Sequence, residues 1–394
     1  MKIHPAEELG FSEERLSRIG VKMQKYVDER KIAGSINLVA RRGQVAYLEK
    51  FGYQDVESKI PMALDTIFRM YSMTKPVTSL AFMMLYEQGE FQLTDPLSKF
   101  IPNFADPRVI APDGGLVPAK REITLHHLLN HTAGFAYGDE EDLVIDMLYR
   151  AADVENYERS LDEFVAVLAG LPLMYHPGDR YHYSLATDVL GRVIEIVSDM
   201  PLDAYFDKFI FKPLGLEDTS FWVPKENHAR FATLYGIKNE DKFAVLDKPD
   251  GEYGKPVKMF SGGHGLVSTT LEYFKIAQLF ANGGDLDGVR LLGPKTVDLM
   301  RMNHLAPGLL PMTFLGESWL GYGFGLGFGV IIDPALAEPR GSLGSYGWGG
   351  YANTHFWIDP VEDIIGLLMM QYLPSRTYPV TDDFHTLVYQ ALIE

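Results

Sequence analysis

Strand-like segments occur near both ends of the chain, and a long helix-rich stretch separates them. Residues 35–40 and 44–49 are strand-like runs joined by a basic turn that ends in glycine, which predicts a hairpin. Residues 342–370 contain three further runs, and the last of them, 364–370, is apolar throughout, as in a central strand covered on both faces. Strands joined by short turns pair antiparallel. The pattern predicts an α+β fold, with an antiparallel sheet flanked by helices and a mainly helical domain inserted into it.

Helical periodicity dominates the middle of the chain. Residues 12–30 and 381–393 are expected to form helices near the two ends, and the stretch 107–118 is expected to be a long exposed loop. We therefore expect residues 1–89 and 216–394 to form a sheet-plus-helix domain and residues 90–215 to form a helical domain, with the active site in the cleft between them. The helices expected in the insertion are 125–130, 143–151, 161–169, 186–198 and 202–210.

Composition excludes several classes of function. The net charge of −17 disfavours nucleic acid and anionic membranes as partners, because both are polyanions. The chain has no cysteine, which excludes disulfides, thiolate metal sites and cysteine nucleophiles. The first residues contain no apolar run typical of a signal peptide, and no stretch is long enough for a membrane helix. We expect a cytoplasmic protein without membrane insertion, whose oligomeric state the sequence does not predict.

The signatures of nucleotide and metal sites are not met. The glycines from Gly321 to Gly329 alternate strictly, which does not fit G-x-G-x-x-G and indicates one strand with a face free of side chains. His127 and His131 stand one helical turn apart, close to His126, but no acidic residue lies between them as in H-E-x-x-H. Structural roles are therefore expected for these histidines, and we expect no metal ion and no cofactor. The G-x-S-x-G elbow of common esterases is also missing.

A single S-x-x-K motif, Ser72-Met73-Thr74-Lys75, follows a predicted short strand over 66–70. It opens an apolar helix that is expected to end near Gln88. A spacing of three places the hydroxyl and the amine on one face of that helix, within mutual reach. An ammonium there lowers the cost of forming an alkoxide, whereas a neutral amine accepts the proton itself. The motif therefore predicts a serine nucleophile with a lysine partner.

Two later segments fit the same chemistry. Residues 177–184, PGDRYHYS, place the phenols of Tyr181 and Tyr183 on a loop before a helix. Near the C-terminus, Gly347-Trp348-Gly349-Gly350-Tyr351 interrupts strand-like sequence with flexible backbone, which can lie beside a nucleophile and direct N–H groups at an oxyanion. The residues alone leave Tyr181 and Tyr183 open as alternatives.

With these motifs, the chain resembles the serine β-lactamase and penicillin-binding protein superfamily, and within it the family VIII carboxylesterases. The resemblance covers essentially the whole chain and includes residues 128–135, LLNHTAGF, and 262–269, GGHGLVST. It implies a β-lactamase/transpeptidase-like fold. It also implies that Ser72 is the acyl-accepting nucleophile, that Lys75 is its activating partner, and that Tyr183 rather than Tyr181 is the second general base or acid.

The resemblance further implies that the backbone N–H groups of Ser72 and Tyr351 form the oxyanion hole. The third motif departs from the β-lactamase pattern, because Trp348, Gly349 and Gly350 stand where Lys-Thr-Gly is usual. The lysine that would pair with a β-lactam carboxylate is therefore missing, whereas neutral esters do not need it. The second motif likewise lacks its usual asparagine, since Leu185 stands there. No Glu-x-x-Leu-Asn segment is present for glutamate-assisted deacylation.

These features predict a serine carboxylesterase that hydrolyses short-to-medium acyl esters through an acyl-enzyme on Ser72. The expected substrate is a small-molecule ester. Sequence leaves open whether Lys75 or Tyr183 takes the first proton, since both are protonated at neutral pH unless their surroundings shift the pKa values. The alternatives are a β-lactamase, a D-amino-acid peptidase or an acyltransferase that uses the same acyl-enzyme, and a catalytically silent binding member of the fold.

Five apolar or aromatic residues are candidates for the substrate pocket. The segment 305–320 is interpreted either as a flap over the pocket or as ordinary surface packing. The candidates are Met312, Phe314 and Trp319 in this segment, with Phe135 and Tyr175 elsewhere in the chain.

Overall fold

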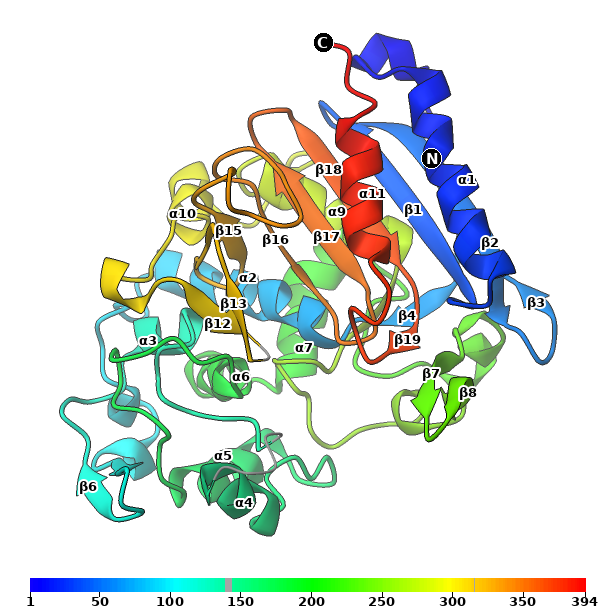
Figure 1. The fold of residues 1–394 in the computed structure, drawn as a ribbon. Helices are drawn as coiled ribbons and strands as arrows, with labels where there is room; N and C mark the ends of the chain where they lie inside the picture. Colours follow the sequence, from blue (N-terminus) through cyan, green and yellow to red (C-terminus); the bar gives the residue numbers. More distant parts are fainter. Residues whose placement is uncertain (139–143, 315) are drawn as a thin grey trace.

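The computed structural model describes residues 1–138, 144–314 and 316–394. Within these ranges, eight strands form one sheet in which every neighbouring pair is antiparallel (Figure 1). Strands from the two ends of the chain meet where β1 pairs with β18, so the predicted antiparallel sheet is confirmed. In spatial order the strands are β14 (Tyr322–Phe324), β15 (Gly329–Ile331), β16 (Tyr346–Gly349), β17 (His355–Asp359), β18 (Ile364–Met369), β1 (Gly34–Arg41), β2 (Gln44–Asp55) and β3 (Ile60–Pro61).

Both faces of the sheet are covered by helices, and β18 shows why its sequence is apolar throughout. Ile365 and Leu367 belong to the larger core, on the face that α9 (Thr270–Ala281) covers. Ile364 and Leu368 alternate with them and pack in a second core beneath α1 (Glu13–Asp28) and α11 (Val380–Tyr389). Figure 1 shows α1 and α11 side by side over this face. A strand with two buried faces has no polar position.

The helical middle of the chain matches the predicted segments closely, with two differences. The segment expected as a loop over 107–118 contains a short hairpin, β5 (Arg108–Ile110) with β6 (Leu116–Pro118). The helix expected over 202–210 is an α-helical turn continued by a π-helical turn, Asp207–Phe211. The expected start of one helix at residue 143 lies outside the described residues. The helices here are α3 (Leu125–Leu129), α4 (Val144–Ala151), α5 (Leu161–Ala169), α6 (Ala186–Ser198), α7 (Leu202–Phe206) and α8 (Lys212–Leu214).

The remaining elements are short. The C-terminal helix ends at Tyr389, four residues before the expected end, and α10 (Pro294–Met300) follows α9. None of the helices in the described ranges is long and apolar enough to cross a membrane. The smaller sheets are β4 (Ile67–Arg69) with β9 (Val267–Thr269), β10 (Asp285–Leu286) with β11 (Val289–Arg290), β12 (Met312–Phe314) with β13 (Glu317–Trp319), and β7 (Leu234–Lys238) with β8 (Asp241–Asp247) and β19 (Tyr372–Leu373).

The glycine-rich segment 321–329 is not one strand, which corrects that prediction. The chain reverses between β14 and β15, and Gly327 takes a φ of 102°, in the region that favours glycine. The expected close approach of another group to the bare backbone does occur at Gly329. A side chain there would clash with the indole of Trp348 on the neighbouring strand. Alternating glycines therefore make room for an aromatic ring as well as for a turn.

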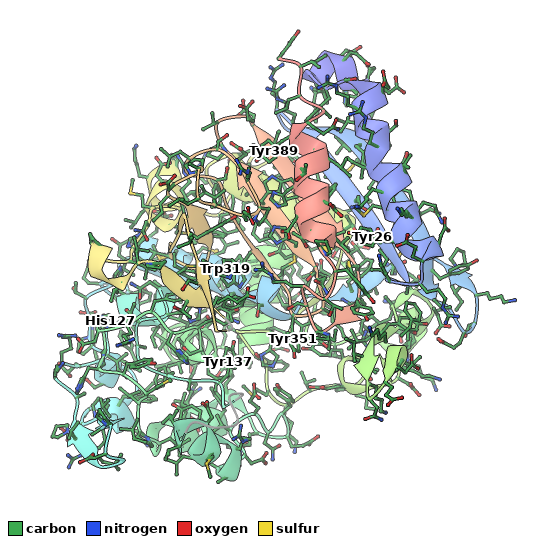
Figure 2. The ribbon with its side chains drawn as sticks, in the orientation of Figure 1. Tyr26, His127, Tyr137, Trp319, Tyr351 and Tyr389 are labelled. Carbon is green, nitrogen blue, oxygen red and sulfur yellow. The ribbon has the colours of Figure 1, made fainter. Side chains whose placement is uncertain are left out.

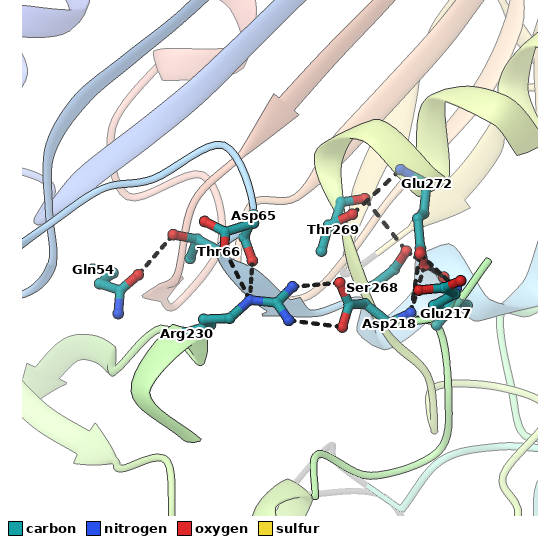
Figure 3. A network of polar contacts seen from close by, with 10 residues as sticks. Gln54, Asp65, Thr66, Glu217, Asp218, Arg230, Ser268, Thr269 and Glu272 are labelled. Carbon is teal, nitrogen blue, oxygen red and sulfur yellow. Dashed lines mark hydrogen bonds and ion pairs between the residues drawn. The ribbon is translucent and has the colours of Figure 1, made fainter. Parts of the chain in front are cut away.

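A polar network secures the strand that leads to the S-x-x-K motif (Figure 3). β4 pairs with β9, and α9 begins directly after β9. Arg230 forms ion pairs with Asp218 and, at 3.0 Å, with Asp65 near the start of β4. Glu272, in the first turn of α9, accepts the backbone N–H of Asp218 at 3.0 Å. The network therefore joins the loop before β4 to the segment around β9, and it fixes the position of the residues that follow β4.

Candidate active site

Ser72 lies in a single 3-10 turn, Tyr71–Met73, between β4 and α2 (Thr74–Glu87). Most residues of α2 are buried on all sides, so the helix passes through the core. Tyr71 has a φ of 45°, a left-handed conformation that costs energy in a residue with a side chain. Its ring makes edge contacts with Tyr253 at 5.6 Å and Tyr351 at 6.0 Å. The turn therefore holds the Ser72 hydroxyl at the beginning of a rigid helix.

Lys75 is 1% exposed, and its amine has three polar neighbours. Nζ lies 3.1 Å from Ser72 Oγ, 2.9 Å from the Tyr137 hydroxyl and 2.9 Å from the carbonyl oxygen of Gly263. A neutral amine has two N–H donors and one lone pair. The two donors match the carbonyl and the phenol, which leaves the lone pair for the Ser72 hydroxyl.

Burial changes the charge of this amine. Desolvation lowers the pKa of Lys75 from 10.5 to about 7, because the ammonium form loses its hydration. The negative charge of Asp188, buried nearby, acts in the opposite direction but more weakly. A large fraction of Lys75 is therefore neutral at physiological pH.

The ring of Tyr183 packs against the amine. Lys75 Nζ is 4.5 Å from the centre of the Tyr183 ring, and the Tyr183 hydroxyl accepts a hydrogen bond from Trp348 Nε1 at 3.0 Å. Burial raises the pKa of Tyr183 well above 10, while hydrogen bonds with the side chains of Ser72, Trp348 and Tyr137 act to lower it. Tyr183 is therefore a neutral phenol at pH 7, within hydrogen-bond reach of Ser72.

The rival tyrosine is not in this group. Tyr181 is buried against His131 and Phe324, with ring distances of 6.3 and 5.5 Å. Its hydroxyl has no partner within the described residues and does not line the cavity beside Ser72. The structure therefore brings together Ser72, Lys75 and Tyr183 and leaves Tyr181 in the core.

The three histidines have packing and capping contacts. His131 is buried against the Tyr183 ring at 4.6 Å, and its Nδ1 accepts the backbone N–H of Ser184. His127 caps the start of α3, and His126 contacts His304 at 3.0 Å. Across the described part of the chain, no three His, Asp or Glu side chains are placed to hold one metal ion.

The third motif lies at the end of β16, beside Ser72. A side chain at Gly350 would clash with the backbone oxygen of Met70, two residues before the serine, so the glycine permits this close approach. Trp348 stands where the β-lactamase pattern has a lysine. Its indole N–H donates a hydrogen bond to the Tyr183 hydroxyl. Tyr351 follows with its ring against Tyr71. The motif therefore supplies a neutral donor and a backbone segment next to the nucleophile.

A cavity of about 520 Å³ opens at Ser72. Of the predicted pocket residues, Phe314 and Trp319 line this cavity. Both come from the β12–β13 hairpin, which lies inside the predicted flap. Residue 315 of that segment lies outside the described residues. Figure 2 labels Tyr137, Trp319 and Tyr351, three of the side chains that line this cavity.

The other three predicted pocket residues are corrected. Phe135 and Met312 are 0% exposed and belong to the core, and Phe135 packs on Phe104 at 5.6 Å. Tyr175 packs instead against Arg180 and His182, away from the lining residues of the cavity. Hydrophobicity in the sequence does not distinguish a wall of the cavity from the core behind it, which is why these expectations were wrong.

Sequence reasoning also missed Tyr137, whose hydroxyl contacts Lys75. Burial raises the pKa of Tyr137 well above 10, so the group is a neutral phenol beside the amine. Tyr137 follows the 128–135 segment by two residues, and that proximity was the only signal in the sequence.

Comparisons with known proteins agree with this architecture. The family model described as Beta-lactamase matches residues 22–390, and the chain therefore belongs to that family. It is 32% identical to Esterase EstB of Burkholderia gladioli over 377 residues, which cover 90% of this chain and 89% of EstB. It is 34% identical to Protein Rv1367c of Mycobacterium tuberculosis over 363 residues, with the same coverage of both chains.

Among solved structures, EstCE1, described as a hydrolase with promiscuous acyltransferase activity, superposes with a TM-score of 0.79. It is 28% identical, and the match covers 95% of this chain and 99% of EstCE1. These comparisons confirm the β-lactamase/transpeptidase-like fold and the resemblance to family VIII carboxylesterases. The protein is an enzyme of the serine hydrolase class.

Proposed function

We propose that the protein is a carboxylesterase that cleaves short-to-medium acyl esters through an acyl-enzyme on Ser72. The observation that carries the proposal is the 3.1 Å contact between Ser72 Oγ and a buried amine whose pKa is lowered to about 7. A serine hydroxyl becomes a useful nucleophile when a neighbouring base takes its proton. The similarity to Esterase EstB supports esters as the substrate class.

In the proposed acylation, Lys75 rather than Tyr183 takes the first proton. Ser72 Oγ forms a bond to the ester carbonyl carbon while its proton moves to neutral Lys75 Nζ. Tyr183 is a poor first base, because burial keeps its hydroxyl protonated. When the tetrahedral intermediate collapses, the bond to the alcohol oxygen breaks, and the alcohol receives a proton from the Lys75 ammonium through the Tyr183 hydroxyl.

Deacylation repeats the same steps with water. Water attacks the acyl carbon, its proton passes to Lys75, and the bond to Ser72 Oγ breaks as that oxygen regains a proton. We assign the oxyanion hole to the backbone N–H groups of Ser72 and Tyr351. Ser72 stands in the first turn of a helical segment, where N–H groups have no partner inside the helix. Two such donors stabilise the charge of the intermediate.

We propose that the cavity is the cleft between the helical domain, residues 90–215, and the sheet-plus-helix domain, residues 1–89 and 216–394. Tyr137, Tyr157 and Tyr183 line it from the first, and Ser72 and Trp348 from the second. Its volume suits a small ester, and its wall is mainly apolar, with many aromatic side chains. Trp348 in place of a lysine offers a neutral substrate an apolar surface and gives a carboxylate no cation.

A panel of p-nitrophenyl esters assayed beside a chromogenic cephalosporin tests the proposal. We expect strong turnover of acetate and butyrate esters and little cleavage of the cephalosporin. The opposite preference would favour a β-lactamase. Transfer of the acyl group to an added alcohol in preference to water would favour an acyltransferase, and no reaction with either substrate or with a fluorophosphonate probe would favour a silent binding protein.

A further inference from the structure

His264 lines the cavity of Ser72, yet the proposed chemistry does not use it. It belongs to the segment 262–265, GGHG, and the residue before it, Gly263, accepts the hydrogen bond of Lys75 Nζ at 2.9 Å. His264 is therefore next in sequence to a residue that contacts the catalytic amine. Its ring makes an edge contact with Tyr157, another lining residue, at 5.2 Å.

Hydrogen bonds determine which nitrogen of His264 carries the proton. The Asp188 carboxylate is buried, and its Oδ1 only accepts, so the Ser261 hydroxyl, 2.5 Å away, must donate to it. Ser261 Oγ then has no hydrogen left for His264 Nδ1, which lies 3.0 Å away. Nδ1 must therefore be the protonated nitrogen that donates to Ser261.

The second nitrogen, Nε2, is left with a lone pair. It makes no hydrogen bond with any other part of the described chain, and it is not among the buried polar atoms without a partner, so it is open to the cavity. Burial lowers the pKa of His264, and the imidazole is neutral at pH 7. A neutral imidazole with Nδ1 protonated presents an acceptor and no donor on the side of Nε2.

The loop is held so that this acceptor has a fixed position. Gly263 donates its N–H to Asp188 Oδ1 at 3.0 Å, and a side chain at this glycine would clash with the same carboxylate. Ser261 Oγ also accepts the backbone N–H of His264 at 3.1 Å, and the Tyr253 hydroxyl donates to the His264 carbonyl at 3.0 Å. Together with the contact between Nδ1 and Ser261, these three hydrogen bonds leave the imidazole little freedom to turn.

We propose that His264 is a specificity-determining residue whose Nε2 accepts a hydrogen bond from a substrate. The substrate class is an ester that carries a hydroxyl or amide N–H donor near the scissile bond. This inference rests on the proposed esterase function and adds to it a preference between esters of similar size. Asp188 and Ser261 act as positioning residues, because they hold the imidazole in the tautomer that accepts.

The test compares pairs of esters that differ by one hydroxyl. The first pair is p-nitrophenyl 3-hydroxybutyrate and p-nitrophenyl butyrate, and the second is 2-hydroxyethyl butyrate and ethyl butyrate, which place the donor on the acyl or the alcohol side. The readout is the ratio of kcat/KM within each pair. We expect His264→Leu to lower this ratio by about tenfold in at least one pair, the effect of one hydrogen bond.

Two further variants separate hydrogen bonding from packing. His264→Gln keeps an acceptor close to the position of Nε2 and should retain much of the ratio. Ser261→Ala keeps the imidazole but removes the partner of Nδ1 and the acceptor of the His264 backbone N–H, so that the other tautomer becomes accessible and the ratio should fall. His4→Leu is the matched control, since His4 lies outside the cavity and its N–H bond to Val45 is made by the backbone.

The outcomes distinguish this inference from the function on which it rests. If the wild-type enzyme hydrolyses none of the four esters, the esterase function itself fails. If it hydrolyses them but the ratios are the same in wild type, His264→Leu and Ser261→Ala, the inference is overturned. An equal loss for both members of each pair overturns it as well, because His264 would then act on a step that does not involve the hydroxyl.

Discussion

The pKa of Lys75 predicts how the stability of the protein depends on pH, and the variant Lys75→Met isolates that effect. In the unfolded chain, Lys75 keeps its proton up to about pH 10.5, whereas in the folded protein burial lowers its pKa to about 7. Between these values the unfolded state binds more protons than the folded state. The contribution of Lys75 to stability therefore rises with pH.

The magnitude follows from the two pKa values. Integrating the difference in bound protons from pH 7, where the folded group is half protonated, to pH 9 gives about 2 kcal/mol. Methionine has a similar length and no titrating group. We therefore expect the free energy of unfolding of the wild type, measured relative to Lys75→Met, to increase by about 2 kcal/mol over this range. Lys75→Met should also lack esterase activity at every pH.

Urea denaturation of both proteins at pH 7, 8 and 9 measures this difference, since titrating groups common to the two proteins cancel. Lys225→Met, at an exposed position, is the control and should show no trend relative to wild type. A difference that stays constant within about 0.5 kcal/mol from pH 7 to 9 would refute the reasoning. Lys75 would then keep its proton in the folded state and would be no base for Ser72.

Two further predictions concern the neighbours of this amine. Asp188→Asn removes the negative charge that raises the pKa of Lys75. The acid limb of the kcat/KM profile, expected near pH 7 in the wild type, should therefore move to lower pH. An acid limb at the same or a higher pH would contradict this prediction. Trp348→Phe keeps the aromatic wall but removes the donor to the Tyr183 hydroxyl, and we expect kcat/KM for p-nitrophenyl butyrate to fall by about tenfold. A folded variant with wild-type activity would show that this hydrogen bond is dispensable.

The fold was largely predictable because its main signals are local. The apolar run at 364–370 and the hairpin that begins at residue 34 indicate strands in the centre of a sheet, and both β18 and β1 are buried along their length. The broken glycine strand was not predictable, since alternation of glycine is compatible both with one strand and with a tight hairpin. At Gly329 the bare backbone is explained by the Trp348 indole, a contact that a single segment of sequence does not reveal.

The site was predictable to the extent that its residues are neighbours in sequence. Ser72 and Lys75 were identified because a spacing of three places them on one helix face, and the structure has them in contact. The choice of Tyr183 over Tyr181 required the family resemblance, because both phenols stand on the same loop. Tyr137 comes from a distant segment without a motif of its own. The catalytic roles of these residues stay predictions.

The central claim is that Ser72 carries the acyl group, and intact-protein mass spectrometry tests it most directly. The protein is mixed with excess p-nitrophenyl butyrate, quenched in acid within milliseconds to seconds, and compared with Ser72→Ala. We expect an added mass equal to one butyryl group on the wild type, located by peptide mapping to the peptide that contains Ser72, and none on the variant. Turnover by Ser72→Ala at the wild-type rate, or a butyryl group on another residue during turnover, would contradict the claim.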